Sequence, residues 1–396
     1  MVVEVSSQEV SAFRLRAHHL TRPLGESGLP EAAGACGIQD SPPGSALLSL
    51  HARVNGVTQD CLDAAVSADK ALIHTWCMRG APYYVPTADA AVFTTGVCPP
   101  TDESMRQFVR GACPSVDQVG LSLTELVERT SAEVRGVLHG RRLAIEPLGK
   151  ELAERIADTL SLQQRQVWES EGLHAPGQPV GEALVHFCVR ILTLRQLVCF
   201  APREGNTAPF VLVEEWLGAP LPVIDASRAR AELVRRYLHC YGPSRRADFA
   251  AWLGVRASDV DPWWSLVEGE MTPVKYGRAA WILSEDLDAL RSSPPPRGVR
   301  LLPPHDPYLQ SRDRDTIVPR QFHKDVWKTV GAPGAIMVDG NLIGTWRPRK
   351  KGTALTLAMR TFDAPSTRIA RLLHGEGERV AQVRGTTLLD VEFTTY

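Results

Sequence analysis

The feature that most constrains the fold of this chain is a recurring order in which short helices are followed by a β-hairpin. In the first instance, helical segments within residues 7–71 precede a hairpin at 72–85. In the second, helices between residues 124 and 197 precede a hairpin at 198–213. Helices followed by a two-stranded wing form a winged helix, so the order predicts tandem modules of this kind.

The third instance is the clearest. Helices at 229–241 and 245–253, a turn at Gly254 and a helix capped by Ser258 lead to a hairpin at 274–283. This is the order of a helix-turn-helix with a wing, which is typical of DNA-binding proteins. Three-helix modules also bind proteins or simply pack, so the pattern alone leaves DNA contact and protein contact open.

A β-rich region follows a proline-rich linker at 292–297. An Asp-Gly pair joins apolar runs at 336–338 and 342–346, which is a strong hairpin signal. Alternating apolar residues predict a strand at 353–359, and we expect a helix at 367–383 with a final strand after it.

The sequence therefore predicts an α+β protein with several domains, as its length of 396 residues also suggests. The predicted domains are winged-helix modules at 1–121, 122–225 and 226–292, and a small β-rich, barrel-like domain at 297–396.

The composition of the chain limits where the protein is expected in the cell and whether it is expected to bind a metal. No apolar run reaches the roughly 18 residues that a membrane helix needs, and the N-terminus lacks the features of a secretory signal, so we expect a cytoplasmic protein without a membrane partner. The 8 cysteines show neither Cys-x-x-Cys pairs nor zinc-finger spacing, which predicts reduced, mostly buried thiols and no metal. We expect His18 and His19 at the surface or as helix caps, because adjacent helical residues diverge.

The formal net charge of −1 differs from that of a typical, basic DNA-binding domain. Several short basic clusters, such as Arg141-Arg142 and Arg245-Arg246, are spread over the modules. Together they could line a groove, although each cluster alone is equally consistent with a solvated face. The near-neutral charge also fits a scaffold that binds only proteins.

Four groups of segments, in this order, resemble the AlkZ/YcaQ-like DNA glycosylases, which are tandem winged-helix proteins with a C-terminal β-domain. The resemblance covers most of the chain, and the last group is long enough to be specific. The segments are 36–46 with 50–53, 74–80 with 84–86, 233–238 with 241–243 and 248–252, and 300–314 with 338–340 and 344–346.

The resemblance implies a monofunctional DNA glycosylase that removes ring-alkylated guanine or adenine from double-stranded DNA and leaves an abasic site. A purine alkylated at position 7 is already cationic and leaves without a general acid. The sugar cation that develops then needs only a nearby acceptor and a positioned water. We therefore expect no cofactor, metal or catalytic lysine, and a monomer associated with the nucleoid.

The family places a Gln-apolar-Gln or Gln-apolar-Asp motif in the turn after its second helix. This chain has Gln39-Asp40-Ser41 at that place. Gln39 could hold the water or the sugar, Asp40 could supply negative charge, and Ser41 could bind the water but is a poor base. The alternative is an ordinary turn that begins a helix, where Asp and Ser are favoured.

Further residues are candidates for DNA contact, each with a structural alternative. Arg79 either supports the first wing or binds phosphate. His305, Asp306 and Arg314 match a family motif and form either a structural network or a DNA contact. The basic loop expected at 347–351 would carry Arg347, Arg349, Lys350 and Lys351 on a hairpin tip, to contact DNA or solvent. Trp76 and Trp346 are expected in the core.

Three functions remain open at this point. The altered Gln39-Asp40-Ser41 turn suggests either a divergent self-resistance glycosylase for bulky adducts of natural products, or a DNA-binding regulator that has lost catalysis. A bulky adduct would require an open cleft, because it does not enter a tight base-flipping pocket. A protein-binding scaffold would show no DNA affinity.

Overall fold

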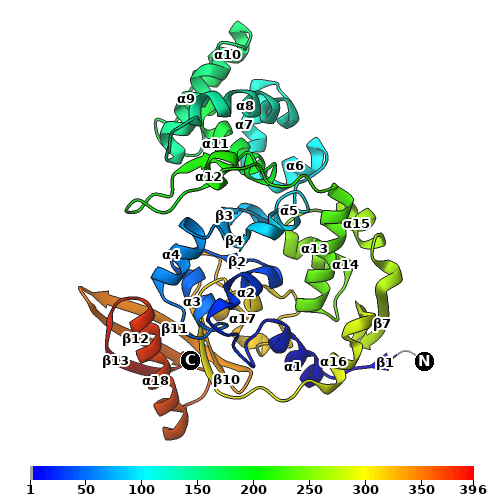
Figure 1. The fold of residues 1–396 in the computed structure, drawn as a ribbon, viewed down its shortest axis with the longest axis vertical. Helices are drawn as coiled ribbons and strands as arrows, with labels where there is room; N and C mark the ends of the chain where they lie inside the picture. Colours follow the sequence, from blue (N-terminus) through cyan, green and yellow to red (C-terminus); the bar gives the residue numbers. More distant parts are fainter. Residues whose placement is uncertain (1–2) are drawn as a thin grey trace. The chain divides into compact units, whose positions relative to one another are not determined.

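The computed structural model describes residues 3–396, and the chain forms two compact units (Figure 1). Unit 1 contains the residues up to Ala68 together with Val234–Trp252 and Val267–Tyr396. Unit 2 contains Asp69–Leu233 and Leu253–Leu266. The sequence predicts four domains, which divide the chain more finely than these two units do. That finer division stays a prediction.

In the N-terminal part of unit 1, short elements lie on both sides of the predicted catalytic turn. They are α1 (Ser7–Ala17), α2 (Leu29–Cys36), β2 (Ile38–Gln39), α3 (Ser45–His51) and α4 (Gln59–Ser67). A capping box between Ser6 and Glu9 fixes the start of α1. Gly37, with φ of 76°, ends α2 in a conformation that residues with a side chain rarely adopt.

The third predicted hairpin belongs to a three-stranded sheet in unit 1. β7 (Met271–Tyr276) and β8 (Arg278–Leu283) turn at Gly277 as expected, and β1 (Val3–Glu4) pairs with β7 in parallel. Apolar residues of this sheet pack on α1 and α16 (Leu287–Ser292). The two preceding helices are α13 (Ala226–Tyr241) and α14 (Arg246–Leu253).

The helix predicted after Gly254 is shorter than expected, and Ser258 does not cap it. Residues Ala257–Val260 form a 3-10 turn that begins at Arg256, and α15 is only Asp261–Ser265. The carboxylate of Asp259 accepts the backbone N–H of Arg256, and this local bond takes the place of the predicted serine cap.

The C-terminal β-rich domain is an open sheet and not a closed barrel. Its strand order is β13 (Thr387–Thr395), β12 (Ala354–Thr361), β11 (Asn341–Lys351), β10 (Gly334–Val338), β9 (Val299–Leu302). Helix α18 (Thr367–Val383), at the predicted bounds, crosses between the parallel pair β12 and β13. The buried Trp346 confirms the core prediction, and its indole N–H donates to the Leu302 carbonyl at 2.9 Å.

Unit 2 combines a helical bundle with a sheet. Its longest helices, α8 (Leu123–Leu138), α9 (Ile145–Ala157) and α11 (Val180–Leu194), pack together. Shorter helices are α5 (Ala90–Phe93), α6 (Asp102–Phe108), α7 (Cys113–Val119), α10 (Leu162–Glu169) and α12 (Val213–Leu217). Helix α9 ends at Ala157, and Ser161 and Gln164 form a capping box that starts α10.

The first and second predicted hairpins share one sheet in unit 2. β4 (Pro82–Pro86) pairs with β3 (Leu72–Trp76), β3 pairs with β5 (Val198–Phe200), and β5 pairs with β6 (Phe210–Leu212). Trp76 is only partly buried there, against Phe200 and Phe210. Both hairpins are therefore confirmed, but they are not independent wings.

No helix among the described residues is long and apolar enough to cross a membrane.

Candidate functional site

The predicted catalytic turn connects β2 to α3 in unit 1, and its first two residues are buried while the third is not. Gln39 and Asp40 are buried, with 7% and 4% of their surface exposed, whereas Ser41 is partly exposed. The prolines that follow are exposed. Of the three side chains, that of Ser41 is therefore the most accessible to solvent.

Gln39 is oriented by a residue that sequence reasoning did not single out. The amide nitrogen Nε2 of Gln310 donates to Gln39 Oε1 at 3.1 Å and to the His305 carbonyl at 2.9 Å. Gln310 lies inside the 300–314 motif, but its role depends on a contact between residues 271 positions apart. A carboxamide held in this way presents a fixed donor and acceptor pattern.

Asp40 caps helix α3. Its Oδ1 accepts the backbone N–H groups of Gly44 at 2.8 Å and Ala46 at 3.2 Å. A carboxylate at a helix N-terminus satisfies N–H groups that have no partner within the helix, and it interacts favourably with the helix dipole. The alternative reading, in which this turn begins a helix, therefore describes the contacts of Asp40 correctly.

A buried ion pair anchors the 300–314 motif to α3. Asp306 is fully buried, and its two oxygens accept Arg53 Nη1 and Nη2 at 2.8 Å each. Ser49 of α3 donates to the same carboxylate at 2.8 Å. Burial opposes the charge on Arg53, but Asp306 outweighs it and raises the arginine's pKa. Asp306 thus belongs to a structural network, and this network holds Gln310 beside Gln39.

The other residues of that motif are more exposed. His305 is exposed and has φ of 59°, a left-handed conformation. The guanidinium carbon of Arg314 lies 4.6 Å from the ring centre of Trp327, and partial burial lowers the pKa of Arg314. Arg314 therefore stacks on an aromatic ring. Its contact with DNA stays a prediction.

Arg79 is the one predicted contact residue in unit 2. It has φ of 57°, and its Nη2 donates to the hydroxyl of Tyr83 on β4 at 2.6 Å. This bond ties the turn between β3 and β4 to the second strand of that hairpin, as the support role requires.

The basic segment at 347–351 is a strand and not the loop that was expected. Arg347, Arg349, Lys350 and Lys351 lie in the last part of β11, and all are exposed. Pairing with β12 extends to the end of the strand, because the chain reverses at Gly352, where φ is 60°. Arg349 forms an exposed ion pair with Glu392 at 2.7 Å, and Arg347 donates to the Gly331 carbonyl.

A cavity of about 500 Å³ lies next to the predicted catalytic turn. Pro43 and Gly44 line one part of it, Lys350 and Arg384 contribute positive charge, and Asp60 contributes negative charge. Sequence reasoning missed Arg384, whose pKa is lowered by burial. A cavity of this size can accept a small organic group.

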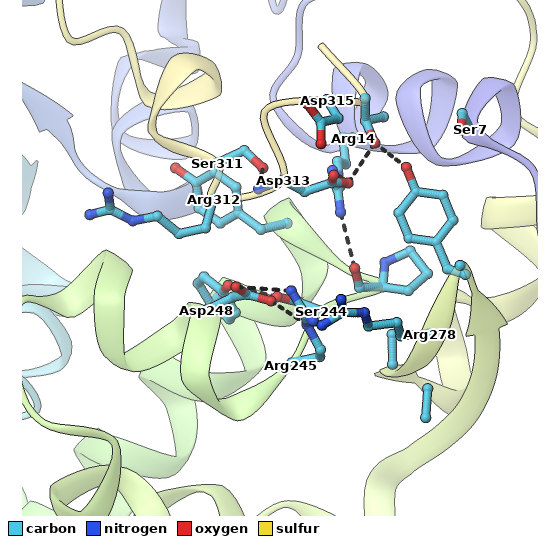
Figure 2. Close-up of a pocket in the computed structure, with 18 residues that line it drawn as sticks. Ser7, Arg14, Ser244, Arg245, Asp248, Arg278, Ser311, Arg312, Asp313 and Asp315 are labelled. Atoms are coloured by element: carbon cyan, nitrogen blue, oxygen red, sulfur yellow. Dashed lines mark hydrogen bonds and ion pairs between the residues drawn. The ribbon is translucent and has the colours of Figure 1, made fainter. Parts of the chain in front are cut away.

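A second, more polar cavity of about 530 Å³ also lies in unit 1 (Figure 2). Arg14 is buried there and bonds to Asp313 at 2.9 Å and to the Pro243 carbonyl at 3.0 Å. Arg245 pairs with Asp248 at 2.8 Å. Arginines and carboxylates alternate around this cavity, so it does not present a uniformly positive surface.

His18 is buried, with 1% of its surface exposed, so the expected surface position is wrong, whereas the expected position at a helix cap agrees with the structure. It follows α1 directly as the C-cap residue, where the chain turns inward towards Cys36 and Tyr241. His19 is partly buried, and desolvation lowers its pKa.

Comparison with known proteins accounts for nearly all of this architecture. The family model "DNA glycosylase AlkZ-like" matches residues 32–383. The "Interstrand DNA cross-link repair glycosylase" of Streptomyces sahachiroi is 24% identical over 398 residues, covering 98% of this chain and 99% of that protein. The solved structure of the S. sahachiroi DNA glycosylase AlkZ has the same fold, with a TM-score of 0.77 and 22% identity over 99% of this chain and 100% of that one. The protein described here therefore belongs to the AlkZ-like family of DNA glycosylases.

Proposed function

We propose that this DNA glycosylase hydrolyses the N-glycosidic bond of alkylated, cationic purines in double-stranded DNA, including bulky and cross-linked adducts, and leaves an abasic site. We further propose that it acts as a monomer on chromosomal DNA in the cytoplasm, in DNA repair or self-resistance. The relative's printed name, a cross-link repair glycosylase, supports this substrate class. An interstrand cross-link joins two alkylated bases, so cleavage of one glycosidic bond releases one strand from the other.

The observation that carries the proposal is the fixed orientation of Gln39. Its amide oxygen is held by Gln310, which in turn is anchored through the buried pair of Arg53 and Asp306. An enzyme that relies on a good leaving group needs preorganised polar groups rather than a strong acid. Gln39 would hold the attacking water or the deoxyribose, in keeping with this arrangement.

The neighbouring residues would play smaller roles. Asp40 brings a carboxylate to the turn, where negative charge favours a developing sugar cation, while its bonds to Gly44 and Ala46 keep it in place. The partly exposed hydroxyl of Ser41 would bind the same water. The cavity next to the turn would receive the substituent of a bulky adduct.

A base-excision assay tests the proposal. Duplexes carrying 7-methylguanine or a nitrogen-mustard interstrand cross-link are incubated with the full chain, and abasic sites are then cleaved with alkali. We expect release from both lesions and none from unmodified guanine. Gln39→Ala should lower release about 10²–10³-fold, while Gln118→Ala, which removes an exposed glutamine of α7, should leave it unchanged.

The second candidate is a DNA-binding protein without glycosylase activity. It is favoured by one observation, namely that the carboxylate of Asp40 serves as a helix cap. Tight duplex binding without release from either lesion would support this candidate and contradict the first.

A further inference from the structure

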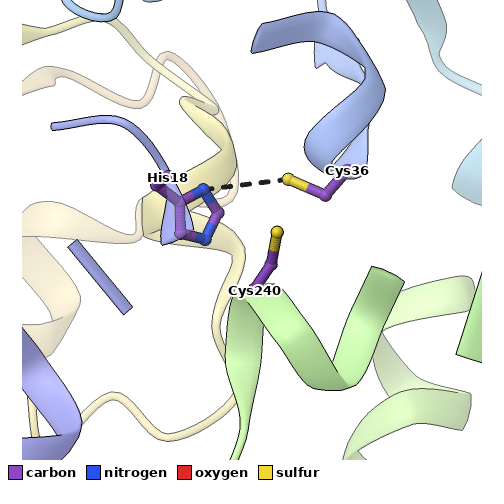
Figure 3. A group of neighbouring side chains, drawn as sticks. All are labelled: His18, Cys36 and Cys240. Carbon is purple, nitrogen blue, oxygen red and sulfur yellow. Dashed lines mark hydrogen bonds between the residues drawn. The ribbon is translucent and has the colours of Figure 1, made fainter. Parts of the chain in front are cut away.

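Three side chains from separate segments meet inside unit 1 (Figure 3). His18 follows α1, Cys36 ends α2, and Cys240 lies near the end of α13. All three are buried, with 1%, 3% and 0% of their surfaces exposed. Their nitrogen and sulfur atoms lie within 4.8 Å of one another, and His18 Nδ1 is 3.8 Å from Cys36 Sγ.

We propose that His18, Cys36 and Cys240 bind a zinc ion. Zinc bonds to sulfur at about 2.3 Å and to imidazole nitrogen at about 2.0–2.1 Å in tetrahedral geometry, which puts neighbouring donor atoms roughly 3.5–3.8 Å apart. The separation of 3.8 Å between His18 and Cys36 agrees with this spacing. Two thiolates and one imidazole form a soft donor set that suits zinc, and one further ligand would complete the tetrahedron.

Charge balance supports a divalent cation at this place. Two buried thiolates would carry two negative charges, which a zinc ion neutralises. Without a cation, a charge in a buried site is costly.

The imidazole is also positioned for binding. The ring of His18 lies edge-on to the rings of Tyr241 and Tyr308, with centroids 5.0 Å and 5.7 Å away, which restricts its rotation. Nδ1 is the ring nitrogen that lies 3.8 Å from Cys36 Sγ, so it is the atom that would bind the ion.

The site would fix the chain that leads into the catalytic turn. Cys36 precedes Gln39 by three residues, and the other two ligands belong to the segments of α1 and α13. Zinc would therefore act as a cross-link between three segments, and not as a reagent in base excision. Metal content can be measured without substrate, so this inference and the proposed function can fail independently.

The test is a zinc measurement on the full chain, purified with a thiol reductant and without chelators. We expect about one zinc per chain by elemental mass spectrometry. Replacement by Co²⁺ should give the sulfur-to-cobalt charge-transfer absorption of a thiolate site. Cys36→Ser and Cys240→Ser should each lower the zinc content at least tenfold, and circular dichroism reports whether they are folded.

Cys188→Ala is the matched control, because this cysteine is equally buried but lies in unit 2. Its zinc content should equal that of the wild type. A chelator should lower the melting temperature of the wild type and of Cys188→Ala, but not of Cys240→Ser. Wild-type protein that contains no zinc and takes up none when reduced would overturn the proposal. So would an unchanged zinc content in folded Cys36→Ser and Cys240→Ser.

Discussion

The side chains of the predicted catalytic turn are buried and held by hydrogen bonds, whereas those at the basic end of β11 are exposed. Gln39 and Asp40 are buried, and each has hydrogen bonds that fix its side chain. Lys350 and Lys351 are exposed on a strand end, where flexible side chains extend into solvent. Chemistry needs groups held in one geometry, whereas phosphate contacts tolerate several. Substitutions in the turn should therefore affect stability and the excision rate, whereas substitutions at the end of β11 should affect only DNA binding, and by less.

The largest effect should come from the ion pair that supports the turn. Asp306→Ala leaves Arg53 buried without its partner, and loss of one member of a buried pair costs about 3–5 kcal/mol. Urea denaturation measures the change in the free energy of unfolding. Glu392→Ala, which removes an exposed pair with Arg349, is the control and should cost about 1 kcal/mol or less. Equal losses would remove the distinction between the two regions.

Loss of the Gln39 carboxamide should reduce catalysis more than binding. Gln39→Ala should lower the single-turnover excision rate about 10²–10³-fold, the size seen when one preorganised polar contact is removed from an active site. Gln310→Ala should lower it less, since Gln310 positions Gln39 and need not contact the substrate. Duplex affinity, measured by fluorescence anisotropy, should stay within about twofold. A fall in affinity with unchanged excision would contradict the assigned role.

The two functions of Asp40 can be separated. Asp40→Ala removes the cap of α3 and should cost about 0.5–2 kcal/mol in the free energy of unfolding. Asp40→Asn keeps an oxygen for the cap but removes the charge, so it should restore most of this stability. The excision rates of the two variants are then compared with that of the wild type. A low rate in both variants would mean that the charge of Asp40 contributes to catalysis. A low rate in Asp40→Ala but a normal rate in Asp40→Asn would mean that only the geometry of the turn matters.

The smallest effect should come from the basic strand. Lys350→Ala should weaken duplex binding only a few-fold, equally for different DNA sequences, and should reduce the salt dependence of binding by roughly one phosphate contact. The excision rate at saturating protein should not change. Lys328→Ala, at an exposed lysine outside β11, serves as the control. An unchanged salt dependence in Lys350→Ala would mean that β11 does not contact DNA.

Local patterns were sufficient for much of the fold. The hairpin turning at Gly277 and the helix α18 lie where apolar periodicity and turn residues predict them. The strand at 347–351 was not predictable in this way, because Pro348 and the surrounding charges are unfavourable for a strand. Pairing with β12 overrides these local preferences.

Contacts between distant residues account for what the sequence did not reveal. The pairing of His74 with Phe200 merges two hairpins that each look like a separate wing. Gln310 could be placed in a motif, but its bond to Gln39 depends on the folded chain. The cysteines and the histidine of the proposed zinc site lack any regular spacing, because their three segments meet only in the tertiary structure.

The wide separation of Gln39 from its partners also has a consequence for biosynthesis. The turn is among the first segments to leave the ribosome, but Gln310 follows 271 residues later. At about 5–20 residues per second, roughly 15–55 s pass before that partner is made. If the proposed role of Gln39 holds, the turn stays incomplete during this interval, and the nascent chain would become competent for base excision only after Gln310 has been translated.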